Sequence, residues 1–168
     1  TFLKISLIII LIFSMFTYSQ FDNEGLLGKN KLNVFMIDVG QGDSFLIKFP
    51  NGKTALIDAG EANPFVDNGE RVIIPLLDYL GINQIDYAFI SHLDLDHYGG
   101  FVSLIYNKRI NKVYRPLPDS GSKSIRLEKF FKEMKEAKIE IVPYLKGKIA
   151  IPVGGQINYR NHRKIVVI

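Results

Sequence analysis

The stretch ISHLDLDHYGG, Ile90 to Gly100, limits what this chain can fold into more than any other part of the sequence. It places two of the three histidines of the chain, and two aspartates, between His92 and His97. The nearly all-apolar run Tyr87–Ser91 comes directly before it and suits a strand buried on both faces by helices. The chain therefore has to present several metal-ligand side chains at the end of a buried strand.

Imidazole and carboxylate groups at this spacing are suited to a site with one or two metal ions. In an extended segment, residues two apart point the same way, so His92 and Asp94 can converge on one ion. A turn at Asp96 would let Asp96 and His97 face a second ion. The leucines between them would then point into the core and hold the loop rigid.

Other kinds of site fit this loop less well. A calcium loop beginning at Asp94 would need Asp or Asn at its fifth position and Glu at its twelfth, where the chain has Tyr98 and Ile105. Nucleophilic catalysis would need a cysteine, which the chain lacks, or a serine in a Gly-x-Ser-x-Gly setting. A polar surface turn would not require two histidines beside a buried strand.

Strand and helix patterns alternate along the rest of the chain. The predicted strands cover residues 31–38, 43–49, 54–58, 87–91, 112–115, 139–143, 148–153, 156–159 and 164–168. The predicted helices cover residues 70–80, 99–107 and 124–138. Asn51-Gly52 is a strong hairpin signal, and Pro75 would kink the first helix or delay its start. This order favours a mixed sheet with helices outside.

The first residues of the chain have the pattern of a secretory signal peptide. The apolar run Ile5–Phe16 follows a lysine and precedes small polar residues, which predicts a signal over 1–19 and a domain over 20–168. A membrane anchor is the alternative, but the run is shorter than the ~20 residues that a spanning helix needs. We therefore expect a secreted or periplasmic protein.

Composition restricts the ligands and the partners. Without cysteine, any metal ligands must be histidines and carboxylates. Removal of Lys4 with the signal leaves 20 basic and 17 acidic residues, a net charge of +3, and the basic residues are scattered. We expect a small-molecule or phosphodiester substrate, whereas a nucleic-acid partner gains no support from this charge pattern.

The motif HLDLDHYGG resembles the His-x-Asp-x-Asp-His-x-Gly-Gly form of the signature of the metallo-β-lactamase superfamily, most of whose members have His at the position of Asp94. The preceding segment FMIDVGQGDSFLIKFPNGKTALIDAG is similar to the hydrolase domain of ComEC-type DNA-uptake competence proteins and their secreted relatives. The resemblance implies an α/β fold, an αββα sandwich, with two divalent ions, most often zinc. The ligands in this chain would be His92, Asp94, Asp96 and His97.

The resemblance also implies supporting residues. Asp58, at the end of TALID, would buttress the ligand loop rather than act as a main ligand. Asp38, Gln41 and Asp43, in DVGQGD, match a loop beside the site, although the two glycines there already explain a tight turn.

The family takes its remaining ligands from later segments, where this chain offers less. The last aspartate is Asp119, and the only later histidine, His162, lies upstream of where the family's third-histidine motif normally comes. We expect His162 not to be a ligand, and the chain to lack the C-terminal portion of the domain. The leading hypothesis is an exported metal-dependent hydrolase in which Asp96 orients the attacking water. The alternative is a catalytically incomplete metal-binding module of the same fold.

The signal-peptide hypothesis predicts that the exported protein begins near Gln20. Intact-mass measurement of the exported protein tests this, because cleavage removes Lys4 together with the apolar run. Retention of Lys4 would show that the segment is an anchor.

Overall fold

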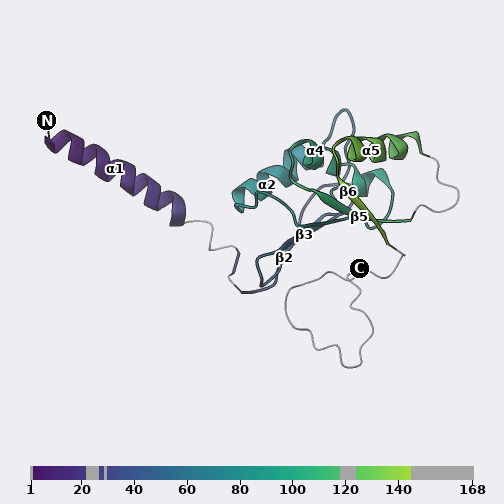
Figure 1. Ribbon diagram of the computed structural model, residues 1–168, viewed down its shortest axis with the longest axis horizontal. Coiled ribbons are helices and arrows are strands. Elements are labelled where there is room, and N and C mark those ends of the chain that lie inside the picture. The colour runs from purple at the N-terminus through teal and green to yellow at the C-terminus, as the bar shows by residue number, and fades with distance from the viewer. Residues whose placement is uncertain (1, 22–26, 29, 118–123, 145–168) are drawn as a thin grey trace, which may run out of the picture.

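The computed structural model describes residues 2–21, 27–28, 30–117 and 124–144. In these ranges the protein is built on a six-stranded sheet, in the order β1-β2-β3-β4-β5-β6, with α2, α4 and α5 on one face (Figure 1). The strands are β1 (Asn33–Met36), β2 (Phe45–Lys48), β3 (Thr54–Ile57), β4 (Tyr87–Phe89), β5 (Lys112–Pro116) and β6 (Glu140–Tyr144). The helices are α1 (Phe2–Phe21), the π-helical turn η1 (Gly69–Ile73), α2 (Ile74–Tyr79), α3 (Leu95–Tyr98), α4 (Phe101–Tyr106) and α5 (Ile125–Glu136).

The sheet changes from antiparallel to parallel at β3. Strands β1, β2 and β3 form the predicted meander, whereas β3, β4, β5 and β6 run parallel, with Ile57 opposite Phe89. The carboxyl ends of parallel strands meet at one edge of a sheet. The loops that follow β3 and β4 therefore emerge side by side, although more than thirty residues separate them.

The turn between β2 and β3 forms at the predicted hairpin signal. Phe49 donates its backbone N–H to the Lys53 carbonyl at 2.8 Å, and Gly52 donates to the Phe49 carbonyl at 2.9 Å. Gly52 has a φ of +83°, a conformation that suits glycine because it has no Cβ. The strong turn signal thus sets the register between these strands.

The helix predicted over 70–80 is divided near Pro75. The π-helical turn η1 comes first, and α2 begins at Ile74, so that Pro75 lies in the first turn of α2. Ile74 still donates its N–H to the Gly69 carbonyl, five residues back, and Pro75, which has no N–H to donate, follows where the π-helical turn becomes α2. The chain is already helical from Gly69, so the predicted late start is wrong, and a change from π- to α-helix takes its place. Gly81, with a φ of +66°, follows the end of the helix.

Two apolar clusters pack on opposite faces of the sheet. The larger cluster joins the helices to the sheet, and its fully buried members include Leu56, Ile73, Leu77, Leu104 and Met134. The smaller cluster lies on the other face and consists of Ile47, Phe49, Ala55, Ile57 and Phe89. The prediction that helices bury β4 on both faces is therefore wrong for the described residues. There, the Phe89 ring stacks on the Tyr114 ring, with centroids 4.7 Å apart.

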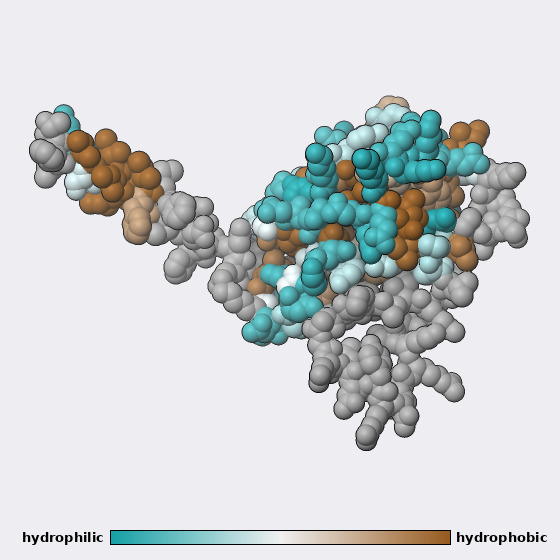
Figure 2. All heavy atoms as spheres, in the orientation of Figure 1, coloured by the Kyte–Doolittle hydropathy of each residue, from teal (hydrophilic) through white to brown (hydrophobic). Residues whose placement is uncertain are grey.

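The predicted signal segment forms the helix α1. Its apolar side chains from Ile5 to Phe13 are exposed and give it a mostly brown surface, whereas teal side chains cover much of α2 and α5 (Figure 2). None of the helices in the described ranges is both long enough and apolar enough to span a membrane. Cleavage near Ser19 stays a prediction. Asp119, His162 and the strands predicted over 148–168 lie outside the described residues.

Hydrogen bonds of Asp86 connect the start of β3 to the start of β4. Its carboxylate accepts hydrogen bonds from the Thr54 backbone N–H at 2.9 Å, the Thr54 hydroxyl at 3.1 Å and Lys53 Nζ at 2.6 Å. Burial alone would raise the pKa of Asp86, but the hydrogen bonds from Lys53 and Thr54 outweigh it and lower that pKa. The stabilisation is therefore present at neutral pH and is lost as the pH falls below about 4.

Replacing Asp86 with Ala should lower the free energy of unfolding by about 1–3 kcal/mol, because it removes the carboxylate that accepts from the buried Thr54 backbone N–H and hydroxyl and from Lys53. Urea unfolding at pH 7 measures this, and the difference from the unmodified protein should shrink towards pH 3. Asp78→Ala is the matched control, since the Asp78 side chain is exposed and Arg109 keeps its hydrogen bonds to the Ile82 and Asn83 carbonyls, so the loss of this ion pair should cost less than about 1 kcal/mol. Equal costs for the two variants would contradict the role given to Asp86.

Candidate metal centre

The ligand loop leaves the carboxyl end of β4 and turns into a short helix. Asp94 is extended, with φ −97° and ψ 148°, and α3 begins at the next residue. The predicted turn before Asp96 is thus present. Leu93 and Leu95 are partly buried against the larger apolar cluster, as expected of the residues that hold the loop in place.

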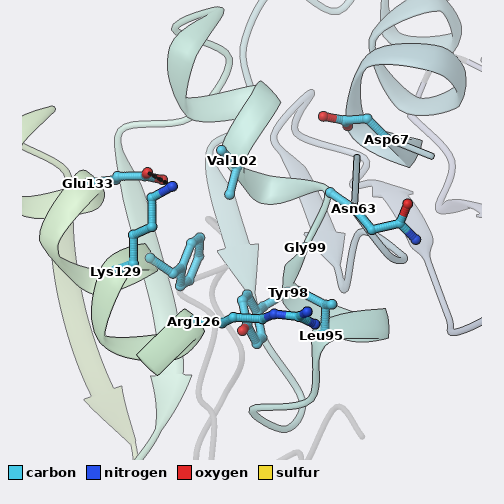
Figure 3. A pocket seen from close by; sticks show the side chains of 11 residues that line it. Asn63, Asp67, Leu95, Tyr98, Gly99, Val102, Arg126, Lys129 and Glu133 are labelled. Carbon is cyan, nitrogen blue, oxygen red and sulfur yellow. Dashed lines mark ion pairs between the residues drawn. The ribbon is translucent and has the colours of Figure 1, made fainter. Parts of the chain in front are cut away.

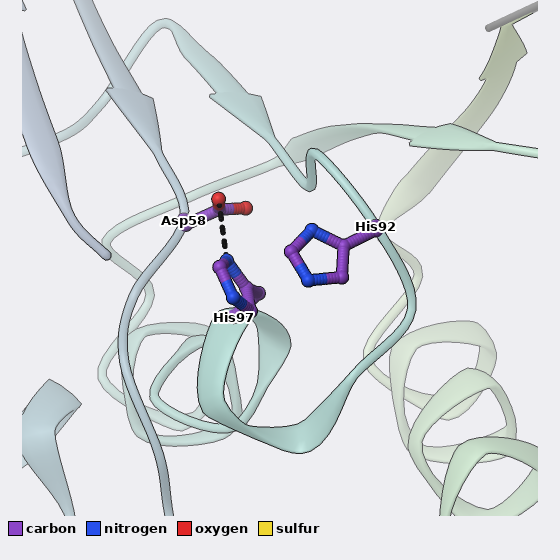
Figure 4. Close-up of side chains that lie close together, drawn as sticks. All are labelled: Asp58, His92 and His97. Carbon is purple, nitrogen blue, oxygen red and sulfur yellow. Dashed lines mark hydrogen bonds and ion pairs between the residues drawn. The ribbon is translucent and has the colours of Figure 1, made fainter. Parts of the chain in front are cut away.

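His92 and His97 are brought together by this turn. Their ring centroids lie 3.6 Å apart, and Asp58 lies beside them at the end of β3 (Figure 4). One ligand atom from each of these three residues falls within 4.8 Å of the other two. Two imidazoles this close can share one ion or hold adjacent ions.

Asp58 is the buried centre of this cluster, with 3% of its surface exposed. One carboxylate oxygen accepts the Ser91 backbone N–H at 2.7 Å, and the other contacts the Ser91 hydroxyl at 2.5 Å and His97 Nδ1 at 2.9 Å. Three donors thus already contact a carboxylate that can accept about four hydrogen bonds. The geometry favours the predicted supporting role over direct ligation.

The backbone at Asp58 has an uncommon conformation. Its φ is +57°, which Asp tolerates better than most residues that carry a Cβ. The Asp58 N–H still donates to the Phe89 carbonyl at 2.8 Å, and the buried Ser44 hydroxyl donates to the Asp58 carbonyl at 3.0 Å. These contacts fix the backbone of Asp58 at the point where the chain leaves the sheet. In this conformation the Asp58 carboxylate faces the ligand loop.

The four predicted ligands form two His-Asp pairs. His92 Nε2 lies 3.5 Å from Asp94 Oδ2, and His97 Nε2 lies 3.8 Å from Asp96 Oδ2. The side chain of His97 is buried, that of Asp96 is 30% exposed and that of Asp94 is 74% exposed. Imidazole nitrogens with carboxylates at an accessible edge fit a zinc-type ion. That the first pair binds one ion and the second pair another stays a prediction.

The DVGQGD loop lies against the ligand helix. Gly42 has a φ of +94°, and a Cβ at this position would overlap the carbonyl oxygen of Asp96. Gly40 donates its N–H to the Asp38 carboxylate at 3.0 Å, and the Asp43 carbonyl accepts from Gly60 at 3.2 Å. Asp38 and Asp43 thus shape the turn through these bonds, while Gln41 is exposed.

The sequence interpretation missed two residues of this site, Ser91 and Tyr144. The Tyr144 hydroxyl donates to the carbonyl of Ile90 at 2.5 Å and lies 3.3 Å from that of Ser91. Burial, and then the negative charge of Asp58, raises the pKa of Tyr144 to about 12. The only sequence signal for Ser91 is its position before His92, and Tyr144 has none.

A pocket of ≈ 270 Å³ lies beside the ligand helix (Figure 3). It is lined by Ala62, Asn63, Asp67, Leu95, Tyr98, Gly99, Val102, Arg126, Lys129, Phe130 and Glu133. Leu95 and Tyr98, one turn apart on α3, face it, whereas His97 from the same helix points to Asp58. Burial raises the pKa of Tyr98, while the charge of Arg126 lowers it and that of Asp94 raises it. The pocket thus adjoins the ligand loop.

Most of the charges around this pocket are engaged. Lys129 forms an ion pair with Glu133 at 3.7 Å. The Asp67 carboxylate accepts hydrogen bonds from the Ser103 hydroxyl at 2.5 Å and from the Glu70 backbone N–H at 3.0 Å. Arg126 forms no ion pair with another residue in the described ranges. Its guanidinium is therefore the charge in this pocket that is most available to an anionic group.

A mixed sheet with helices on one face, and an Asp-His cluster at the carboxyl edge of its parallel strands, is consistent with a metal-dependent hydrolase-like fold. Residues 37–154 match the family model of the Metallo-beta-lactamase superfamily. The match spans most of the chain, and the chain belongs to this superfamily, whose members are mostly metal-dependent hydrolases. The predicted α/β fold class is confirmed.

Curated relatives include competence proteins. ComE operon protein 3 of Bacillus subtilis (strain 168) is 32% identical over 117 residues, which are 62% of this chain and 14% of that protein. Uncharacterized protein YcaI of Escherichia coli (strain K12) is 40% identical over 73 residues, 44% of this chain and 9% of that protein. Competence protein ComA of Neisseria gonorrhoeae is 36% identical over 73 residues, 44% of this chain and 10% of that protein. The resemblance to ComEC-type proteins is confirmed, and the chain spans only a small part of these relatives.

Removing a ligand should lower the metal content. We expect His92→Ala and His97→Ala to bind less zinc than the unmodified protein in elemental analysis after zinc loading and desalting, because each loses an imidazole from the cluster. His162→Ala is the matched control and should keep its zinc. Equal zinc in all three variants would contradict the ligand assignment.

Proposed function

We propose that this protein is an exported, metal-dependent hydrolase that acts on phosphodiesters or related esters. The observation that carries the proposal is the Asp58-His92-His97 cluster, with Asp94 and Asp96 beside it, at the carboxyl edge of the parallel strands. Membership of a superfamily of mostly metal-dependent hydrolases supports the same reaction type.

The side chains of the cluster would have three different roles: metal binding, orientation of the attacking water, and positioning of a ligand. His92 and His97 would hold the metal through Nε2, together with Asp94 and Asp96. Bound divalent ions, of which zinc fits the donor set best, would polarise the scissile bond and lower the pKa of a water so that hydroxide forms near neutral pH. Asp96 is partly exposed and lies 3.8 Å from His97 Nε2, so its carboxylate can accept a hydrogen bond from the attacking water and orient it. Asp58 keeps the imidazole of His97 in place.

The substrate class rests on three observations. One relative of this chain is named Competence protein ComA. The carboxylate of Asp94 takes the position at which the resembled superfamily mostly has a histidine. The Arg126 guanidinium in the pocket beside α3 could pair with a phosphate that flanks the scissile bond. In-line displacement at a phosphodiester also suits a two-ion site, because the attacking and leaving oxygens both need positive charge. We therefore favour phosphodiesters over β-lactams.

A catalytically incomplete metal-binding module is the second candidate. The observation that favours it is the size of the donor set: in the described residues the cluster draws its two histidines from a single loop. Such a module would bind zinc without turnover. Metal binding alone therefore cannot separate the two candidates, and an assay of hydrolysis can.

The hydrolase proposal predicts turnover of bis-p-nitrophenyl phosphate by the zinc-loaded protein, and none of a chromogenic cephalosporin. Asp96→Asn should lower kcat for the diester by about 10²–10⁴-fold, because the amide orients water less well and cannot accept its proton. Asp78→Ala, far from the cluster, should leave kcat unchanged. Turnover of the cephalosporin alone, abolished in His97→Ala, would show that the substrate class is wrong. Zinc binding without hydrolysis of either substrate would favour the second candidate.

A further inference from the structure

Ser91 lies between the Asp58 carboxylate and the imidazole of His92. Its hydroxyl oxygen is 2.5 Å from Asp58 Oδ2 and 2.9 Å from His92 Nδ1. A serine hydroxyl has one proton to donate and two lone pairs to accept with. The direction of the two contacts therefore determines which nitrogen of His92 carries a proton.

The Ser91 hydroxyl donates its proton to Asp58. An ionised carboxylate can only accept, and Asp58 already faces two further donors, the Ser91 backbone N–H and His97 Nδ1. With its proton directed to Asp58, the Ser91 oxygen faces His92 with a lone pair. Nδ1 of His92 must then carry a proton, and the lone pair of the neutral ring is on Nε2, the atom nearest Asp94.

We propose that Ser91 is a positioning residue that extends the influence of Asp58 to His92, so that one buried carboxylate sets the tautomer of both histidines. Asp58 acts directly on His97 and, through the Ser91 hydroxyl, on His92. In both rings Nδ1 carries the proton and Nε2 is available to a metal ion. The inference rests on the proposed function only in taking His92 as a metal ligand.

The position of the Ser91 hydroxyl is fixed from both sides. The Ser91 N–H is bound to Asp58 Oδ1 at 2.7 Å, and the Tyr144 hydroxyl lies 3.3 Å from the Ser91 carbonyl. The backbone of Ser91 is therefore fixed, and its hydroxyl contacts both Asp58 and His92 without rearrangement.

The first test is ¹⁵N NMR of the histidine side chains in the metal-free, full-length chain, at a pH where the imidazoles are neutral. We expect His92 to be protonated at Nδ1, and Ser91→Ala to convert it to a mixture of tautomers or to the Nε2-protonated form. His97 should not change in this variant, because Asp58 still binds it. Ser91→Thr keeps the hydroxyl and should restore the His92 signal.

The matched control is Ser44→Ala. Ser44 is also a buried serine bonded to Asp58, but to its backbone carbonyl, so this variant should leave both histidine tautomers unchanged. Thermal unfolding of each variant shows whether the chain folds. A His92 tautomer that is the same in the unmodified protein and in a folded Ser91→Ala variant would overturn the proposal.

The second test is zinc affinity, measured by competition with a chromophoric chelator. Loss of a residue that orients a ligand typically weakens metal binding by about 10–100-fold, and we expect this for Ser91→Ala but not for Ser91→Thr or Ser44→Ala. Unchanged zinc affinity in Ser91→Ala would also count against the proposal. The NMR result needs neither zinc nor turnover. A protein that binds no zinc but shows the Ser91-dependent tautomer would therefore refute the metal centre and retain the hydrogen-bond relay.

Discussion

The buried carboxylate of Asp58 connects the two chain segments on which the candidate site depends. A buried carboxylate is costly unless its oxygens are hydrogen-bonded, and Asp58 meets this condition with the backbone and hydroxyl of Ser91 and with His97. Each donor comes from the ligand loop, so satisfying the carboxylate also fixes the loop. The parallel pairing of β3 with β4 makes this contact geometrically available.

Close approach of backbones completes the arrangement. Gly42 lets the DVGQGD loop lie directly against the carbonyl of Asp96, and a Cβ at Gly100 would overlap the carbonyl oxygen of Ala59. Both glycines are needed because three chain segments converge behind the ligands without room for a side chain. The ligand loop is therefore held by its neighbours' backbones as well as by the hydrogen bonds of Asp58.

The helix α3 links the candidate metal centre to the pocket next to it. His97 on one side of this short helix contacts Asp58, while Tyr98 and Leu95 line the pocket with Arg126 of α5. The pocket and the candidate metal centre are therefore neighbours on either side of one short helix.

The sequence by itself determined the ligand loop, the three-stranded meander, the helix α5 and the family. These features depend on residues close together in the chain: hydrophobic period, turn chemistry and a motif with fixed spacing. Only the tertiary structure decided that the helices of the described residues cover one face of the sheet, that Asp58 bonds Ser91 and His97, and that Tyr144 reaches the start of the loop. These contacts join residues 33 to 54 positions apart. They depend on strand order and register, which local patterns do not specify because the same strands could pair in several ways with similar local energies.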